Sequence, residues 1–264
     1  MDVIESANGV AKFERGRTLH LVQGFILEKR MNYAVVLSGG VGARMQDVSI
    51  PKQYLRVDEK PIIIYTLEKF ERCIDIDQIF VVAMEEWKGY LWKECQKYHI
   101  NKLADIVDNG NSRQESIFNG IKKCMEVSGG DNDKVVIHDA VRPMVKASTI
   151  SESIRAVGEY DGCMPVLSMK DTLYYSATGN EITNLLEREK IYAGQAPETF
   201  NLHKYYQANV GLSTEELEQI HGTSELAYKK GMRIKLIAGD EENFKITTKV
   251  DLTRFEWMIK ECKQ

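Results

Sequence analysis

A glycine-rich loop, LSGGVGARM at residues 37–45, follows the apolar run YAVVL directly, and the cluster PKQY at 51–54 comes soon after it. In open α/β sheets, ligands bind beyond the carboxyl ends of the strands, where glycines let backbone N–H groups approach a phosphate. Gly39, Gly40 and Gly42 stand at such positions. The glycines alone fit a tight strand-to-helix connection equally well, so the neighbouring residues must decide.

Two better-known phosphate-binding patterns fail at this loop. Counted from Gly40 and Gly42, the dinucleotide pattern G-x-G-x-x-G would need its third glycine where Met45 stands. The Walker pattern needs Lys-Ser or Lys-Thr after the glycines, and neither is present. Arg44 and Lys52 instead suit a triphosphate whose leaving pyrophosphate must be stabilised. Taken singly, each is better interpreted as a solvated surface cation, and only the neighbouring motifs favour a phosphate site.

A second polar cluster, IHDAVRP at 137–143, ends another apolar run. Asp139 can hold a metal or a ribose hydroxyl, and Arg142 an acceptor phosphate. The alternative is an internal Asp139–Arg142 ion pair that shapes the turn. His138 has no partner at metal-ligand spacing, so we interpret it as structural.

The elements that must position these residues are short β-branched runs that alternate with amphipathic helical patterns. The predicted strands are 33–37, 78–83, 104–107, 134–138, 163–167 and 233–238. Ser112 with Glu115, and Thr149 with Glu152, have the spacing of capping boxes and predict helices that begin there. Most of the strands are apolar enough to be buried on both faces. The alternation therefore predicts an α/β fold with a mostly parallel sheet covered by helices on both faces.

Two segments stand outside this alternation. Residues 171–199 carry the turn signal TGN between two short patterned runs, which favours a hairpin. A two-stranded hairpin is marginal in water, and a second subunit is a reasonable support for it. Residues 1–30 are interpreted as an N-terminal extension, because the first convincing strand follows Met31. We predict one large domain over residues 31–264.

Bulk properties argue against several classes of protein. The 264-residue chain has a formal net charge of −4, which gives no support to nucleic acid as the main partner. Its five cysteines are widely spaced without a C-x-x-C pair, as expected of a reduced cytosolic chain. No apolar run reaches the roughly 18 to 20 residues that span a membrane, and the opening residues lack a signal-peptide pattern. We expect a cytoplasmic protein without a membrane or nucleic-acid partner.

Seven motifs together resemble one family. In chain order they are LSGGVGARM with PKQYL, SRQESIFNGI, HDAVRP, KDT, LLER, GQAPETF and NFKITTKVDL. Their order and spacing are similar to those of the cytidylyltransferases that make 4-diphosphocytidyl-2-C-methyl-D-erythritol and CDP-ribitol. The resemblance spans residues 31 to about 260. It implies a Rossmann-like nucleotidyltransferase fold and a homodimer in which a protruding β-arm, about 171–198, completes the partner's pocket.

The resemblance also implies roles for individual residues. Those assigned to CTP are Ser38, Gly39, Gly40, Gly42, Gly110, Arg113, Ser116 and Asp139. Of these, the residues expected near the cytosine are Gly110, Arg113 and Ser116. Those assigned to catalysis are Arg44, Lys52 and Lys245. Those assigned to the acceptor are Arg142 and Thr223, together with Thr172 and Arg188 from the arm of the other subunit. The implied cofactor is Mg²⁺, with Asp139 as a candidate ligand.

The implied reaction is attack of a polyol-phosphate oxygen on the α-phosphorus of CTP, with release of pyrophosphate. Because that oxygen is already ionised, no general base is required. Motifs outside the catalytic ones look more like the ribitol-phosphate enzymes, so we expect D-ribitol 5-phosphate as the acceptor, with 2-C-methyl-D-erythritol 4-phosphate as the alternative. Ala196 and Ser224 stand where the family usually has Thr and Asp, both on the acceptor side.

A non-catalytic nucleotide-binding subunit is the alternative from a different class. Retention of both Arg44 and Lys52 favours the enzyme over this alternative. A dehydrogenase is disfavoured, because the dinucleotide pattern fails at the glycine loop.

Overall fold

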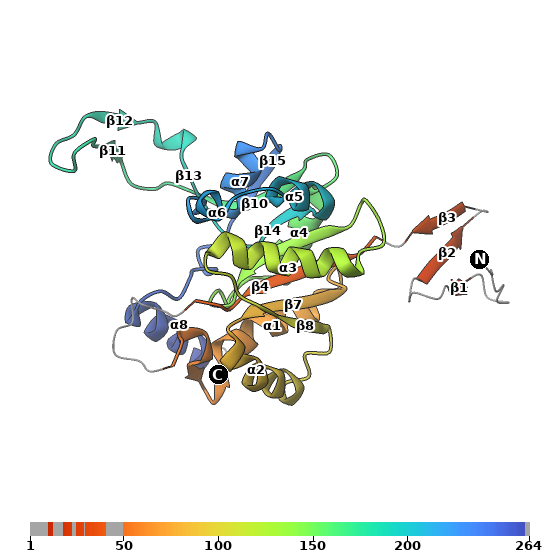
Figure 1. Ribbon diagram of the computed structural model, residues 1–264. Helices are drawn as coiled ribbons and strands as arrows, with labels where there is room; N and C mark the ends of the chain where they lie inside the picture. Colours follow the sequence, from red (N-terminus) through yellow and green to blue (C-terminus); the bar gives the residue numbers. More distant parts are fainter. Residues whose placement is uncertain (1–9, 13–17, 23–24, 29, 41–49, 262–264) are drawn as a thin grey trace.

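The computed structural model of the protein describes residues 10–12, 18–22, 25–28, 30–40 and 50–261. Its centre is a mixed eight-stranded sheet with helices on both faces (Figure 1). The strands are β4 (Asn32–Leu37), β7 (Gln78–Ala83), β8 (Leu103–Asp108), β9 (Lys134–Asp139), β10 (Gly162–Ser168), β13 (Tyr192–Gly194), β14 (Glu198–Asn201) and β15 (Ile234–Ala238). Each strand predicted from the sequence is therefore present, and the predicted fold class is confirmed.

The strands run in the order β13-β10-β14-β9-β4-β7-β8, and β15 pairs with β10. β4 lies parallel to both β7 and β9, and β7 lies parallel to β8. β14 is antiparallel to β9 and β10, which makes the sheet mixed. The central strand β4 is buried on both faces, as its continuous apolar run predicts. Parallel β4 and β9 end at the same edge of the sheet, so the segments that follow them meet there.

Eight α-helices are present in the described residues: α1 (Ile62–Arg72), α2 (Glu85–Lys97), α3 (Arg113–Val127), α4 (Ala147–Ala156), α5 (Leu202–Asn209), α6 (Thr214–Glu218), α7 (Thr223–Lys229) and α8 (Lys249–Glu261). Side chains of α1, α2 and α4 form one hydrophobic cluster against the sheet. Those of α3, α5 and α7 form a second cluster that packs on the opposite face. α8 packs its Phe255 against Val57 and Ile62 in a third, smaller cluster.

The two predicted helix starts differ in outcome. At α3, the Ser112 hydroxyl accepts the Glu115 N–H at 3.1 Å, which confirms that cap. At α4, the predicted cap by Thr149 and Glu152 is wrong. The Thr149 N–H already donates to the Lys146 carbonyl at 3.0 Å, so Thr149 lies inside the first turn and the helix begins at Ala147.

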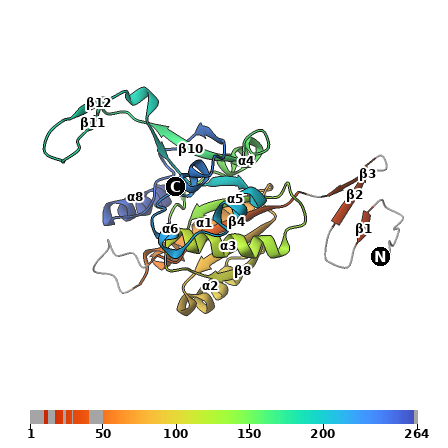
Figure 2. The ribbon, with the colours of Figure 1, turned by 45° about the horizontal axis from the view of Figure 1, so that its top comes forward.

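The arm is a hairpin that extends away from the sheet (Figures 1 and 2). β11 (Leu173–Tyr175) pairs antiparallel with β12 (Asn184–Leu186) and with no other strand of the described residues. A short 3₁₀ helix, η2 (Arg188–Lys190), leads back into β13. The hairpin predicted from the TGN turn is confirmed. Its Tyr174 and Leu185 side chains are 58% and 60% exposed.

The N-terminal residues contain a small antiparallel sheet of β1 (Val10–Lys12), β2 (Thr18–Val22) and β3 (Phe25–Glu28). This sheet does not pair with the eight-stranded one. The boundary at Met31, and a single domain over 31–264, remain predictions. Among the helices that the structure describes, none combines the length and the apolarity that a membrane span requires.

Four of the five cysteines fall within the described residues. They are Cys73, Cys95, Cys124 and Cys163, and each is a buried free thiol. For these four, the expectation of a chain without a disulfide framework is confirmed. Cys262 lies outside the described residues.

Candidate active site

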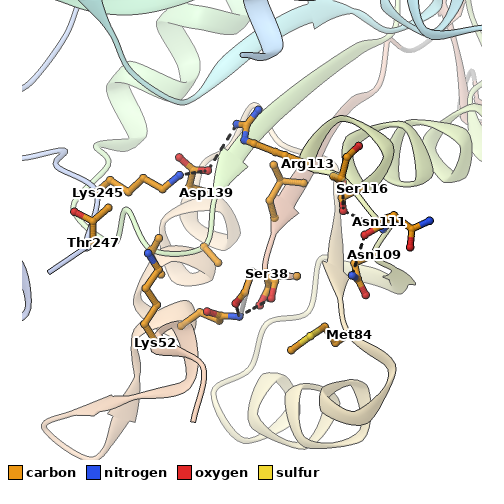
Figure 3. Close-up of a pocket in the computed structure, with 18 residues that line it drawn as sticks. Ser38, Lys52, Met84, Asn109, Asn111, Arg113, Ser116, Asp139, Lys245 and Thr247 are labelled. Atoms are coloured by element: carbon orange, nitrogen blue, oxygen red, sulfur yellow. Dashed lines mark hydrogen bonds and ion pairs between the residues drawn. The ribbon is translucent and has the colours of Figure 1, made fainter. Parts of the chain in front are cut away.

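A cavity of about 680 Å³ opens at the carboxyl ends of β4 and β9 (Figure 3). Its size is that of a small-molecule site. The residues predicted for the site that line it are Ser38, Gly39, Gly40, Lys52, Gly110, Arg113, Ser116, Asp139 and Lys245. The structure thus brings together residues from five separate parts of the sequence. Gly42 and Arg44 lie outside the described residues.

The start of the glycine loop is clamped by the residues that follow it. Gln53, in the 3₁₀ helix η1 (Lys52–Tyr54), is 2% exposed and donates its side-chain amide to the carbonyls of Ser38 at 2.6 Å and Gly40 at 3.0 Å. The Ser38 hydroxyl donates to the Tyr54 hydroxyl at 3.0 Å. Lys52 lines the cavity from the same short helix. Side chains of η1 therefore both fix the loop and place a cation beside it.

Packing around this clamp makes it rigid. The Tyr54 ring stacks on Trp87 with the ring centroids 4.4 Å apart. Burial raises the pKa of Tyr54 to about 12, so its hydroxyl stays neutral at physiological pH. On the other side of the loop, a Cβ added to Gly39 would lie 2.7 Å from the Cβ of Asn109. Only glycine fits there, because the loop lies directly against the segment that precedes α3.

Three cations surround one carboxylate at the opposite side of the cavity. An Asp139 oxygen lies 3.1 Å from Lys245 Nζ and 3.7 Å from an Arg113 guanidinium nitrogen (Figure 3). The second Asp139 oxygen lies 3.1 Å from Arg142 Nε. Burial raises the pKa of Asp139, but the positive charges of Lys245, Arg113 and Arg142 outweigh it and hold that pKa well below its usual range. Asp139 is therefore ionised, and the cluster has an excess of positive charge suited to an anion.

The Asp139–Arg142 ion pair, one of the two interpretations left open by the sequence, is present. Arg142 also donates to the Asn243 carbonyl at 2.7 Å and does not line the cavity. His138 is fully buried, contacts the Arg142 carbonyl at 3.1 Å and lies against Phe70. Burial lowers the pKa of His138 to about 4, so the ring is neutral at pH 7. These contacts agree with the structural interpretation of His138.

The residues expected near the cytosine divide into two groups. Ser116 accepts the Gly110 N–H at 3.0 Å and donates to the Ser112 carbonyl at 2.9 Å, so its hydroxyl shapes the loop before α3. The Arg113 guanidinium instead turns toward Asp139 and donates to the Thr223 hydroxyl at 2.9 Å. Arg113 thereby joins two residues that the sequence placed with the ribose and the acceptor.

The predicted arm residues do not reach this cavity within one chain. Thr172 and Arg188 are exposed, and neither lines it. Arg188 donates to the Lys170 carbonyl at 3.0 Å, which holds the base of the arm. Thr223 is fully buried behind Arg113. A shared site therefore needs the arm of a second subunit, which remains a prediction.

The acceptor-side departures have defined contacts. Ser224 donates both its backbone N–H, at 2.8 Å, and its hydroxyl, at 2.5 Å, to one oxygen of Glu198. Ala196 is buried, and its carbonyl accepts from Asn243 at 2.6 Å. Glu198 and Gln53 were missed from the sequence. Gln53 stands beside Lys52 in PKQY, and Glu198 stands in GQAPETF, so both lie in motifs that the sequence analysis quotes without giving either residue a role.

Asp139 is the only acidic residue among the described residues that line the cavity. The described part of the chain holds no cluster of three side chains able to bind a metal by themselves. Mg²⁺ is typically bound by one or two carboxylates together with substrate phosphates and water. The donor set therefore fits a magnesium ion that a bound triphosphate would share with Asp139.

Comparison with known proteins gives one family. A family model described as IspD, 2-C-methyl-D-erythritol 4-phosphate cytidylyltransferase, matches residues 32–261. Among solved structures, 4-diphosphocytidyl-2C-methyl-D-erythritol synthase from Anaerococcus prevotii has a TM-score of 0.73 at 20% identity, over 88% of this chain and 96% of that chain. The Francisella tularensis 2-C-methyl-D-erythritol 4-phosphate cytidylyltransferase has a TM-score of 0.70 at 24% identity, over 86% and 99%. At these identities, the structures establish a shared fold.

Proposed function

The chain belongs to the 2-C-methyl-D-erythritol 4-phosphate cytidylyltransferase family and is a nucleotidyltransferase that uses CTP; from this premise we propose that it transfers CMP from CTP to 2-C-methyl-D-erythritol 4-phosphate. The family predicted from the seven motifs is confirmed. The comparisons favour this acceptor, which the sequence analysis placed second, over D-ribitol 5-phosphate. The product would be a precursor of isoprenoids rather than CDP-ribitol for a cell-wall or capsule polysaccharide.

The observation that carries the proposal is the separation of two cationic centres across one cavity. Lys52 lies beside the clamped glycine loop, and Lys245 and Arg113 lie around Asp139. The reaction requires two anionic substrates to come close together, a triphosphate and a phosphomonoester. Separate positive centres offset their mutual repulsion and orient both for in-line attack.

In the proposed reaction, an acceptor phosphate oxygen forms a bond to the α-phosphorus of CTP. The bond from that phosphorus to the bridging oxygen breaks, and pyrophosphate leaves. Lys52 neutralises charge on the phosphates as it develops. Asp139 is too weak a base to take a proton, since its pKa is held low, and an ionised nucleophile does not need one. Bound Mg²⁺, shared with Asp139, would supply further charge neutralisation at the phosphates.

Acceptor preference is tested by measuring pyrophosphate release from CTP with each polyol phosphate. We expect kcat/KM for 2-C-methyl-D-erythritol 4-phosphate to exceed that for D-ribitol 5-phosphate by at least about tenfold, the size expected of one or two polar contacts. Mass spectrometry of the CDP product confirms the transfer. The reverse ratio would assign the ribitol acceptor and leave the CTP chemistry intact, and no product from either acceptor would overturn the proposal.

Gln53→Leu tests whether the clamp on the glycine loop serves CTP binding. The substitution keeps the approximate volume but removes both amide donors to the loop, each worth about 1 kcal/mol. We expect kcat/KM for CTP to fall by about tenfold, mainly through KM, as the loop loses its fixed position. Gln96→Leu, on the exposed face of α2, is the matched control. Unchanged kinetics in Gln53→Leu would show that the Gln53 hydrogen bonds to the glycine loop do not contribute to CTP binding.

A further inference from the structure

Glu198 is a carboxylate held in β14 with only 9% of its surface exposed. One of its oxygens accepts both the backbone N–H and the hydroxyl of Ser224. Among the described residues, no Lys, Arg or His pairs with it. A carboxylate buried to this extent is costly unless donors satisfy it, so Ser224 and Glu198 depend on each other.

Ser224 is the second residue of α7, where backbone N–H groups have no partner within the helix. The N-cap residue is Gly222, which has no side chain to fill this role. Glu198 therefore supplies a helix cap from a neighbouring strand, and its negative charge suits that end of a helix. The Glu225 side chain also caps this end of α7 by accepting the His221 and Gly222 N–H groups, and Glu198 adds the tie between the first turn and the sheet.

The first turn of α7 in turn holds a residue of the cavity. Thr223, immediately before Ser224, accepts from the Arg113 guanidinium at 2.9 Å through its hydroxyl and from the Tyr205 hydroxyl at 2.9 Å through its carbonyl. The other guanidinium nitrogen of Arg113 reaches toward Asp139 (Figure 3). Thr223 thus orients the Arg113 guanidinium. The position of Thr223 in turn depends on the hydrogen bonds between Ser224 and Glu198.

We propose that Glu198 is a positioning residue: by binding Ser224 it fixes the first turn of α7, so that Thr223 holds the Arg113 guanidinium beside Asp139 in the CTP cavity. This proposal extends the proposed function to the support of the CTP site. It rests on the proposal that the cavity binds CTP and does not depend on which acceptor is used. It also accounts for Ser224 where the family usually has Asp. A carboxylate at that position would face Glu198 at hydrogen-bond distance, and the two negative charges would repel each other.

The test is a double-mutant cycle on the dissociation constant of CTP, measured by calorimetry without any acceptor. We expect Glu198→Leu and Arg113→Ala each to weaken CTP binding by about tenfold, and the double variant to be no weaker than Arg113→Ala. Glu198→Gln, which keeps an acceptor oxygen for Ser224, is the conservative control and should stay within about twofold of the wild type. The proposal would be overturned if Glu198→Leu weakened CTP binding as much in the Arg113→Ala variant as in the wild type. Glu198 would then act on the structure in general and not through Arg113.

A second pair of variants covers the case in which Glu198→Leu does not fold. Ser224→Asp should weaken CTP binding by about tenfold through charge repulsion, and adding Glu198→Gln should restore it to within about threefold, because an amide can donate to the new carboxylate. Failure of Glu198→Gln to restore binding would also overturn the proposal. Because no acceptor is present, a wrong acceptor assignment leaves these results unchanged.

Discussion

Lys52→Ala is expected to lower kcat for pyrophosphate release by about 10²–10³-fold while the fold persists. Lys52 lines the cavity beside the glycine loop, where the proposed reaction would develop charge on the leaving pyrophosphate. The effect should fall on kcat more than on KM for CTP, since a cation at this position acts most strongly in the transition state. Steady-state kinetics with saturating acceptor measure both parameters.

The fold should survive because Gln53 and Tyr54 anchor η1 through contacts that the substitution keeps. Gln53 and Tyr54 bind the loop through their side chains, and the Tyr54 N–H bonds to the Pro51 carbonyl at 2.9 Å. Lys93→Ala, on the exposed face of α2, is the matched control for loss of one positive charge. Turnover near the wild-type value in Lys52→Ala would show that Lys52 does not stabilise the transition state.

Deleting the arm is expected to convert a dimer into a monomer and to reduce transfer activity by at least about 10²-fold. The hairpin pairs only with itself among the described strands, and its exposed apolar side chains include Tyr174, Ile182 and Leu185. We propose that a second copy of the chain covers them. Residues 172–189 can be replaced by two glycines, because the antiparallel pairing of Ser168 in β10 with Tyr192 in β13 holds the two ends of the arm side by side. Sedimentation at micromolar concentration and the pyrophosphate assay give the two readouts.

A complementation experiment separates an arm that acts on the partner's site from one that only holds the dimer together. The Lys52→Ala subunit has a defective pocket and an intact arm. The Arg188→Ala subunit has an intact pocket and a defective arm. Co-expressed, the two inactive variants should regain about one quarter of wild-type activity, since half of the dimers would contain one complete site. A fully active monomer, or mixed dimers with no activity, would contradict a site shared between subunits.

Most of the sheet could be predicted because buried parallel strands are continuous apolar runs that stand out locally, as at β4 and β7. The runs that were missed lack this contrast. β14 reads ETFN, with polar residues at both ends, and α6 spans only five residues, too few to establish a helical period. The wrong start of α4 has a similar origin: capping-box spacing around Thr149 occurs by chance inside a helix.

The cavity could be predicted in outline because parallel strands end at one edge of a sheet. That rule alone brings the residues after β4 and β9 together. It cannot predict which way a long side chain turns, and Arg113 turned to Asp139 and Thr223 rather than toward Ser116. Glu198 lies in the motif GQAPETF, but its pairing could not be predicted, because Ser224 is distant in the sequence and contacts Glu198 only in the folded chain.

The three hydrophobic clusters of the described residues contain no residue between 171 and 194. Substitutions in the arm therefore cost the body of the protein little folding free energy, whereas substitutions around the glycine loop disturb a packed and hydrogen-bonded clamp. Under mutation and selection, the two parts of the chain are free to diverge at different rates. Under the predicted role of the arm in binding the acceptor, a lineage could acquire a new acceptor through substitutions in the arm and still inherit its use of CTP unchanged.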